Sequence, residues 1–289
     1  MNLTAGKKIL YFVLFLCFAV GIGAASVYDL KISSHLSELS GSGAGLTLNV
    51  PSYAKVLEIL GEWPAVLLCS VAVLILAAVL AEKHPSQALF IRIFSPLPVA
   101  VLAAYGCMKT AEHLTGTLST RDMLFVAVGA AMITLLLSLI VSCVPQETKR
   151  RLFLPAAATL AAACAILIVT SGIKVVWGRI RLRELVAAGS LDGFTPWYRP
   201  NFFSGSHSFP SGHTAHNTLT LMLPLWARTK KCRIALWTLS ALWIIAMAFS
   251  RLAAGAHYLS DVLFGFLIAF VITEIARHAC EKRVQSSPK

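Results

Sequence analysis

Three short segments in the second half of the chain gather ionisable side chains between long apolar runs. They read KVVWGRIRLR (residues 174–183), SFPSGHTAHN (208–217) and SRLAAGAHYLSD (250–261). Their side chains can bind an anion, carry a proton or attack an electrophile. Such groups are costly at membrane depth, so their accumulation marks candidate functional sites.

The first segment contributes closely spaced cations. Lys174 and Arg181 are seven residues apart, so both point towards one ligand if a helix continues for two turns between them. Four cations this close require an anion or solvent. An anion site and a solvated basic helix face are both compatible with this segment.

The second segment places Pro-Ser-Gly-His (210–213) directly before an apolar run. Small residues such as Ser211 and Gly212 at a helix start expose backbone N–H groups, and the helix dipole adds to their attraction for an anion. His213 would lie beside that anion. Its alternative role is that of a helix cap or a hydrogen-bonded structural histidine.

The third segment contains a histidine and a carboxylate four residues apart. On a helix, Asp261 would lie one turn from His257 and could accept a hydrogen bond from one ring nitrogen, leaving the other free to attack. Arg251 adds a fixed cation. A purely structural polar pair is the alternative. The 38 residues from His213 to Arg251 allow one crossing of a membrane and one return, which brings the second and third segments to the same face as Lys174.

The composition indicates which elements must position these residues. The chain has 289 residues, of which 57% are hydrophobic and only 13% charged, with a mean hydropathy of +0.75. These values exclude an ordinary soluble protein and predict an all-α, polytopic bundle of transmembrane helices. The seven cysteines are odd in number and several lie inside apolar runs, so no disulfide framework is expected, and no CxxC pair indicates a cysteine metal site.

The apolar runs predict about eight spans, with both termini cytoplasmic. An external loop is expected over residues 29–62, with a short amphipathic helix near 53–60. The first span could be a cleaved signal peptide, but its length favours an anchor. Most basic residues then lie inside, as the positive-inside rule requires, so the net charge of +12 needs no nucleic-acid partner. The predicted spans lie within residues 8–29, 62–82, 93–108, 122–147, 151–174, 213–227, 234–250 and 255–276.

Together the three segments resemble the motifs of the type 2 phosphatidic acid phosphatase superfamily, K-x6-RP, PSGH and SR-x5-H-x3-D. One position departs from them, because Leu182 stands where the family has proline. The resemblance implies a six-span core, here with two added helices. The expected domains are N-terminal helices at 1–151, a phosphatase core at 152–277 with an active-site loop at 174–213, and a cytoplasmic tail at 278–289.

The resemblance also implies roles for the site residues. His257, oriented by Asp261, would attack phosphorus, and His213 would protonate the leaving oxygen and then activate water. No metal or other cofactor is expected, since side-chain cations and a helix start would hold the phosphoryl oxygens. His207 and His216 match no motif position and are interpreted as a loop and a helix-face residue. The expected phosphate-binding residues are Lys174, Arg181, Ser211, Gly212 and Arg251.

The expected activity is hydrolysis of a lipid phosphate or pyrophosphate at the outer face of the cell membrane. Its partners would be that substrate and membrane lipids. An isoprenyl pyrophosphate, phosphatidylglycerophosphate, phosphatidic acid and a lipid A phosphate all fit. An anion or lipid transporter or binding protein is the main alternative. A vanadium haloperoxidase-like oxidase shares the pocket ligands, but the hydrophobicity argues against it. The aromatic residues in the expected loop, interpreted as interface anchors, are Trp177, Trp197, Tyr198, Phe202 and Phe203.

Overall fold

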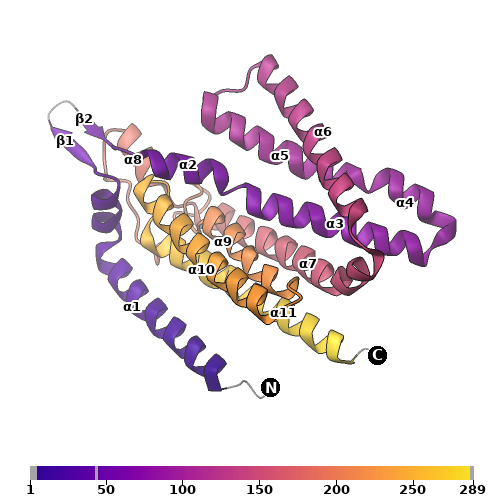
Figure 1. Ribbon diagram of the computed structural model, residues 1–289. Helices are drawn as coiled ribbons and strands as arrows, with labels where there is room; N and C mark the ends of the chain where they lie inside the picture. Colours follow the sequence, from indigo (N-terminus) through magenta and orange to yellow (C-terminus); the bar gives the residue numbers. More distant parts are fainter. Residues whose placement is uncertain (1–4, 43–44, 287–289) are drawn as a thin grey trace. The chain divides into compact units, whose positions relative to one another are not determined.

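The computed structural model describes residues 5–42 and 45–286, and nearly all of its regular structure is helical (Figure 1). Seven of its helical segments are long and apolar enough to cross a membrane. The prediction of a helical membrane protein is therefore confirmed in its general form. The segments are Tyr11–Leu36, Ser52–Lys83, Pro85–Thr115, Thr120–Cys143, Gln146–Ala187, Lys230–Ala253 and Leu259–Ser286.

Several of these segments are built from consecutive helices. The described elements are α1 (Ala5–Leu36), β1 (Ser40–Ser42), β2 (Gly45–Thr47), α2 (Ser52–Leu60), α3 (Trp63–Lys83), η1 (Pro85–Gln87), α4 (Ala88–Phe94), α5 (Pro96–Thr115), α6 (Thr120–Cys143), α7 (Gln146–Trp177), α8 (Leu182–Ala187), α9 (Gly212–Thr218), η2 (Leu219–Leu225), α10 (Lys230–Ala253) and α11 (Leu259–Ser286).

The sixth of the eight predicted spans, over residues 213–227, does not form a long helix. It consists of the seven-residue α9 and the seven-residue 3-10 helix η2, with Pro224 inside the latter. Proline lacks the backbone N–H that a continuing α-helix needs. The count of eight is thus not confirmed, and the orientation of the termini stays a prediction.

The predicted external loop starts later than expected. Helix α1 continues past Asp29 to Leu36, and Asp29 is buried rather than exposed in a loop. A two-stranded antiparallel hairpin follows, in which Ser40 pairs with Thr47 and Gly41 with Leu46. The short helix expected near residues 53–60 is present as α2.

The chain divides into two compact units that interleave along the sequence. The first contains Met1–Lys55, Val169–Ala215 and Ala248–Ile268, and the second contains the remaining segments. In the second unit, Ala72 and Ile75 of α3 pack with Val99 of α5, Val141 of α6 and Ala156 of α7. All the predicted site residues belong to the first unit. Residues 278–286, expected as a tail, continue α11, and the predicted domain boundaries stay predictions.

Candidate functional site

The end of helix α7 positions the first cation. Lys174 lies in the last turn of α7, which ends at Trp177. Gly178 then adopts a φ of +60°, and a Cβ there would lie 2.0 Å from the Asn201 carbonyl oxygen, so only glycine fits this turn. The helix therefore does not continue from Lys174 to Arg181, contrary to the two-turn arrangement that the spacing suggested.

Lys174 reaches the PSGH segment. A Cβ built on Gly212 would lie 2.9 Å from the Lys174 Nζ, so the ammonium group lies against the backbone at the start of α9. Ser211, just before α9, donates its N–H to the Asp261 carbonyl oxygen (2.8 Å), and its hydroxyl accepts a bond from the Thr214 N–H (3.4 Å). Ser211 thus caps α9 and ties it to α11.

His257 lies in the turn between α10 and α11 rather than on a helix. Its N–H donates to the Arg251 carbonyl oxygen (3.3 Å). Asp261 occupies the first turn of α11, and its Oδ2 lies 3.6 Å from the His257 Nδ1, too far for a hydrogen bond. The expected pair is therefore brought together by a helix start and not by one turn of helix. Because Nδ1 faces Asp261, Nε2 is the ring nitrogen left for attack.

The arginines of the predicted site are held differently. Arg251 is fully buried, and its Nη2 donates to the Ala54 carbonyl oxygen (3.1 Å). Arg181 is about a quarter exposed; it donates from Nη1 to the Glu184 Oε1 (3.2 Å) and from Nη2 to the His207 carbonyl oxygen (3.5 Å). Arg251 is thus held in place inside the protein through its contact with Ala54, whereas Arg181 is partly open to solvent.

The surroundings of His257 keep its imidazole neutral. Burial lowers the pKa of His257 to about 3, and the positive charges of Lys174 and Arg181 lower it further, against the opposing effect of the Asp261 carboxylate. Lys174, Arg181 and Asp261 therefore all lie close enough to His257 to influence its charge state. A neutral imidazole is the form that can attack an electrophile.

The remaining predicted residues lie on α9 and the loop before it. His213 is the second residue of α9 and is half-buried. His216 lies on the same helix, and His207 is an exposed loop residue, as expected for both. Trp177 stacks on Phe209 (4.8 Å between ring centroids), and the Trp197 Nε1–H donates to the Ser26 Oγ (3.0 Å). These two tryptophans thus pack inside the first unit.

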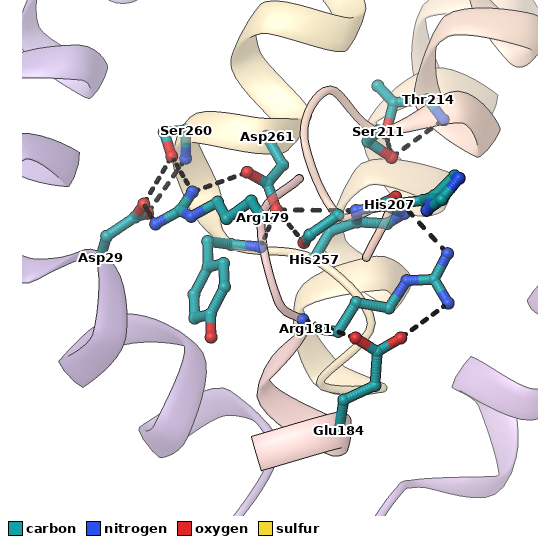
Figure 2. Close-up of polar contacts among 12 residues, drawn as sticks. Asp29, Arg179, Arg181, Glu184, His207, Ser211, Thr214, His257, Ser260 and Asp261 are labelled. Carbon is teal, nitrogen blue, oxygen red and sulfur yellow. Dashed lines mark hydrogen bonds and ion pairs between the residues drawn. The ribbon is translucent and has the colours of Figure 1, made fainter. Parts of the chain in front are cut away.

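The structure also reveals a buried ion network that the sequence interpretation missed (Figure 2). Arg179 donates from Nη2 to the Asp29 Oδ2 (2.8 Å) and from Nη1 to the Asp261 Oδ1 (2.6 Å). Ser208 donates its hydroxyl to the Asp261 Oδ2 (2.5 Å), and Ser260 donates both its N–H and its hydroxyl to Asp29. A lone acidic residue at the end of the first apolar run was the available signal, but its partner is 150 positions away.

Leu182 explains how the chain tolerates the loss of the family proline. It is the first residue of α8 and is fully buried. Proline is favoured at the first position of a helix because its fixed φ suits a helix and its missing N–H is not needed there. The helix start that a proline would favour is therefore formed with leucine, and the Glu184 carboxylate accepts a bond from the Arg181 N–H (3.1 Å) at the same place.

The apolar helices indicate a membrane protein, and its first compact unit brings a histidine-carboxylate pair together with cations. Residues 152–285 match the family model of the PAP2 superfamily. This match supports the predicted resemblance to the type 2 phosphatidic acid phosphatase superfamily, a family of membrane phosphatases. No curated protein and no solved structure matches the chain significantly.

Proposed function

We propose that this protein is a phosphatase of the cell membrane that hydrolyses a lipid phosphate or pyrophosphate at the outer face through a phosphohistidine intermediate. The match of residues 152–285 to the PAP2 family model points to phosphatase activity. The observation that carries the mechanism is the neutral, buried His257 held beside Asp261 and acted on by Lys174 and Arg181.

The position of these residues along the helices supports a lipid substrate. Lys174 is close to the end of α7, Arg251 is close to the end of α10, and Asp261 is close to the start of α11. Helix ends of this kind lie near the boundary between hydrocarbon and water. An amphiphile presents its phosphate head group at that boundary while its apolar chains stay in the membrane.

In the first step, the Nε2 of His257 forms a bond to phosphorus as the bond from phosphorus to the leaving oxygen breaks. His213 gives a proton to that oxygen, and Asp261 stabilises the positive charge that develops on the ring of His257. Lys174, Arg181 and Arg251, with Ser211 and the backbone of Gly212, stabilise the phosphoryl oxygens, whose charge spreads over three positions.

In the second step, a water molecule attacks phosphorus and His213 accepts its proton. The bond between phosphorus and nitrogen breaks, inorganic phosphate leaves and His257 returns to its neutral form. The side-chain cations supply the charge stabilisation that a metal ion supplies in other phosphatases, so no metal or other cofactor takes part.

The test is to trap the covalent intermediate. The purified protein is mixed with an aryl phosphate, quenched, and assayed for acid-labile phosphate on the polypeptide. The wild type and His213→Ala should be labelled, because a phenolate leaves without protonation, while His257→Ala should not. Label on His257→Ala but not on His213→Ala would exchange the two roles, and label on none of the three would reject the covalent mechanism.

The substrate is identified by phosphate release from a panel of lipids in detergent. The panel contains an isoprenyl pyrophosphate, phosphatidylglycerophosphate, phosphatidic acid and a lipid A phosphate. Release from one of them identifies the substrate class. Binding of these lipids without release of phosphate would instead support the alternative of an anion or lipid transporter or binding protein.

A further inference from the structure

Arg179 lies between two buried carboxylates, only one of which belongs to the proposed catalytic machinery. The exposed fractions of Asp29, Arg179 and Asp261 are 2%, 1% and 0%. The guanidinium joins them through bonds of 2.8 Å to Asp29 and 2.6 Å to Asp261 (Figure 2). Asp29 lies on α1, outside the segment that matches the family model.

The packing of α1 fixes the position of the Asp29 carboxylate. Ala25, Asp29 and Ser33 recur every four residues of α1 and are all buried, so they share one face of the helix. A Cβ on Gly21, one turn earlier, would lie 2.9 Å from Leu263 of α11, which shows how closely this face approaches α11. The packing of this face against α11 therefore holds the Asp29 side chain in place.

Each carboxylate accepts hydrogen bonds from three donors. Asp29 accepts bonds from Arg179 and from the N–H and hydroxyl of Ser260. Asp261 accepts bonds from Arg179 (2.6 Å), the Ser208 hydroxyl (2.5 Å) and the Tyr258 N–H (2.9 Å). An ionised carboxylate can only accept hydrogen bonds, which matches three donors at each site.

These contacts allow a charge count. Within the network itself, two carboxylates and one guanidinium give a net charge of −1 on the Asp261 side of His257. When the Nε2 of His257 bonds to phosphorus, its ring becomes cationic, and the network and the ring together become neutral. Without the Asp29 charge, Arg179 would neutralise Asp261 in advance, and the ring would carry an uncompensated charge in a buried site. Such a charge is costly away from water.

We propose that Asp29 is a positioning residue for the reaction: by neutralising Arg179 it leaves the negative charge of Asp261 for the cationic ring of His257. Arg179 in turn fixes Asp261, and its guanidinium carbon lies 4.1 Å from the centroid of the Tyr258 ring. Helix α1 thereby contributes one residue to a site whose proposed catalytic and phosphate-binding residues all lie within residues 152–285. This inference rests on the proposed function.

The alternative is that the network merely fastens α1 to the rest of the first unit. The two explanations differ in the effect of a second substitution. Asp29→Asn removes one negative charge, and adding Arg179→Gln removes the positive charge, which restores the net charge of −1. Charge compensation therefore predicts recovery of activity in the double variant, whereas a fastening role predicts a further loss.

The experiment measures kcat, KM and acid-labile phosphate for each variant, per milligram of monodisperse protein in detergent. Asp29→Asn should lower kcat about 100-fold with little change in KM, as expected when charge stabilisation at a catalytic histidine is lost. The Asp29→Asn/Arg179→Gln variant should regain at least about tenfold of that loss. Ser33→Ala, on the same buried face of α1 and one turn away, should match the wild type.

The other outcomes are also decisive. Two results would overturn this inference but leave the proposed function intact, provided that the wild type is active and takes up label. The first is an unchanged kcat in Asp29→Asn, and the second is a double variant that is slower than Asp29→Asn. If Asp29→Asn does not fold, the double variant decides: kcat within about tenfold of wild type supports the inference, and a larger loss rejects it. A wild type that neither releases phosphate nor takes up label would overturn the proposed function and this inference with it.

Discussion

His257 is the residue at which burial and charge most directly determine chemistry. Its side chain is almost fully buried, and Lys174 and Arg181 act on it as positive neighbours. Both influences disfavour the imidazolium form, and Asp261 only partly offsets them. The nucleophile that we propose is consequently ready for attack without a prior proton transfer.

The protonation of His257 gives the first prediction. Its pKa of about 3 lies below the ordinary histidine value of about 6.5, so the ring should stay neutral from pH 5 to 8. Between pH 3 and 6.5 the unfolded chain would bind more protons than the folded one, so the free energy of unfolding should fall as the pH drops through this range. Nuclear magnetic resonance of protein with isotope-labelled histidine measures the titration.

The His257 signal is assigned as the one that disappears in His257→Ala. Free histidine added to the same sample serves as the internal control, since its signal shifts with pH near its ordinary pKa of about 6.5. A His257 signal that titrates near pH 6.5 would contradict the buried, neutral state and would make protonation of the nucleophile a cause of activity loss in acid.

The cations of the site give the second prediction. If Lys174, Arg181 and Arg251 supply the charge stabilisation, phosphate release should survive EDTA. Vanadate should inhibit, because it adopts the five-coordinate geometry of the transferring phosphoryl group. Arg181→Gln should weaken vanadate inhibition about tenfold or more, since a charge-assisted bond is lost. Complete loss of activity in EDTA, restored by Mg²⁺, would show that a metal takes part.

Single residues also show what the sequence could and could not predict about the site. The residue types and spacing around Lys174, Arg181, His257 and Asp261 sufficed to group them, because each occurs beside an apolar run where charge is costly. Asp29 and Arg179 could not be paired in this way. Their contact joins positions 150 residues apart, and only the packing of α1 against α11 creates it.

At the scale of helices, the start of α9 depends on a close approach between two elements. The ammonium of Lys174, at the end of α7, lies against the backbone of Gly212. Lysine can occupy this place only because Gly212 has no side chain. The glycine of the PSGH motif thus makes room for a cation as well as allowing a helix start.

This contact gives the third prediction. In Gly212→Ala the new Cβ would lie 2.9 Å from the Lys174 Nζ, so the flexible end of the lysine must move. The value of kcat/KM should fall about 10- to 100-fold, as displacement of a positioned group commonly does. Thermal stability should change little, because alanine favours a helix over glycine. Steady-state kinetics and a thermal melt in detergent measure the two effects.

Gly172→Ala is the matched control, because it makes the same substitution in α7 at a position where a Cβ would meet nothing within 4 Å. It should retain wild-type activity. Equal activity in Gly212→Ala and Gly172→Ala would show that the position of Lys174 does not matter for turnover.

The helices also mark the limits of prediction from sequence. Long uncharged runs predicted most of the candidate spans, because a helix in lipid must be apolar along its length. The ends of helices were predicted less well. Helix α1 extends past Asp29, because the carboxylate of Asp29 forms an ion pair with Arg179 and so can be buried. The segment at 213–227 is apolar but forms two short helices, α9 and η2, instead of one long helix. The presence of Pro224 alone was not enough to predict this division.

At the scale of the whole molecule, hydrophobicity and charge together predict how the chain is placed in its membrane. Most basic residues outside the site segments lie in the parts expected to face the cytoplasm. Under this arrangement the loop at 174–213 faces outward, together with the proposed catalytic residues, and the basic segment 228–233 faces inward. The substrate would then be a lipid whose head group lies in the outer leaflet.

The fourth prediction tests this orientation with a membrane-impermeant maleimide in intact cells. Two single-cysteine proteins are compared, each with the other native cysteines replaced by alanine: one carries Ala188→Cys, in the exposed turn after α8, and the other keeps the native Cys232, which is exposed near the start of α10. Ala188→Cys should react from outside and Cys232 should not, while both should react after the cells are opened with detergent. Because both positions are exposed in the protein, protection in intact cells reports the side of the membrane and not burial. Labelling of Cys232 with protection of Ala188→Cys would invert the arrangement and place the phosphatase site on the cytoplasmic face.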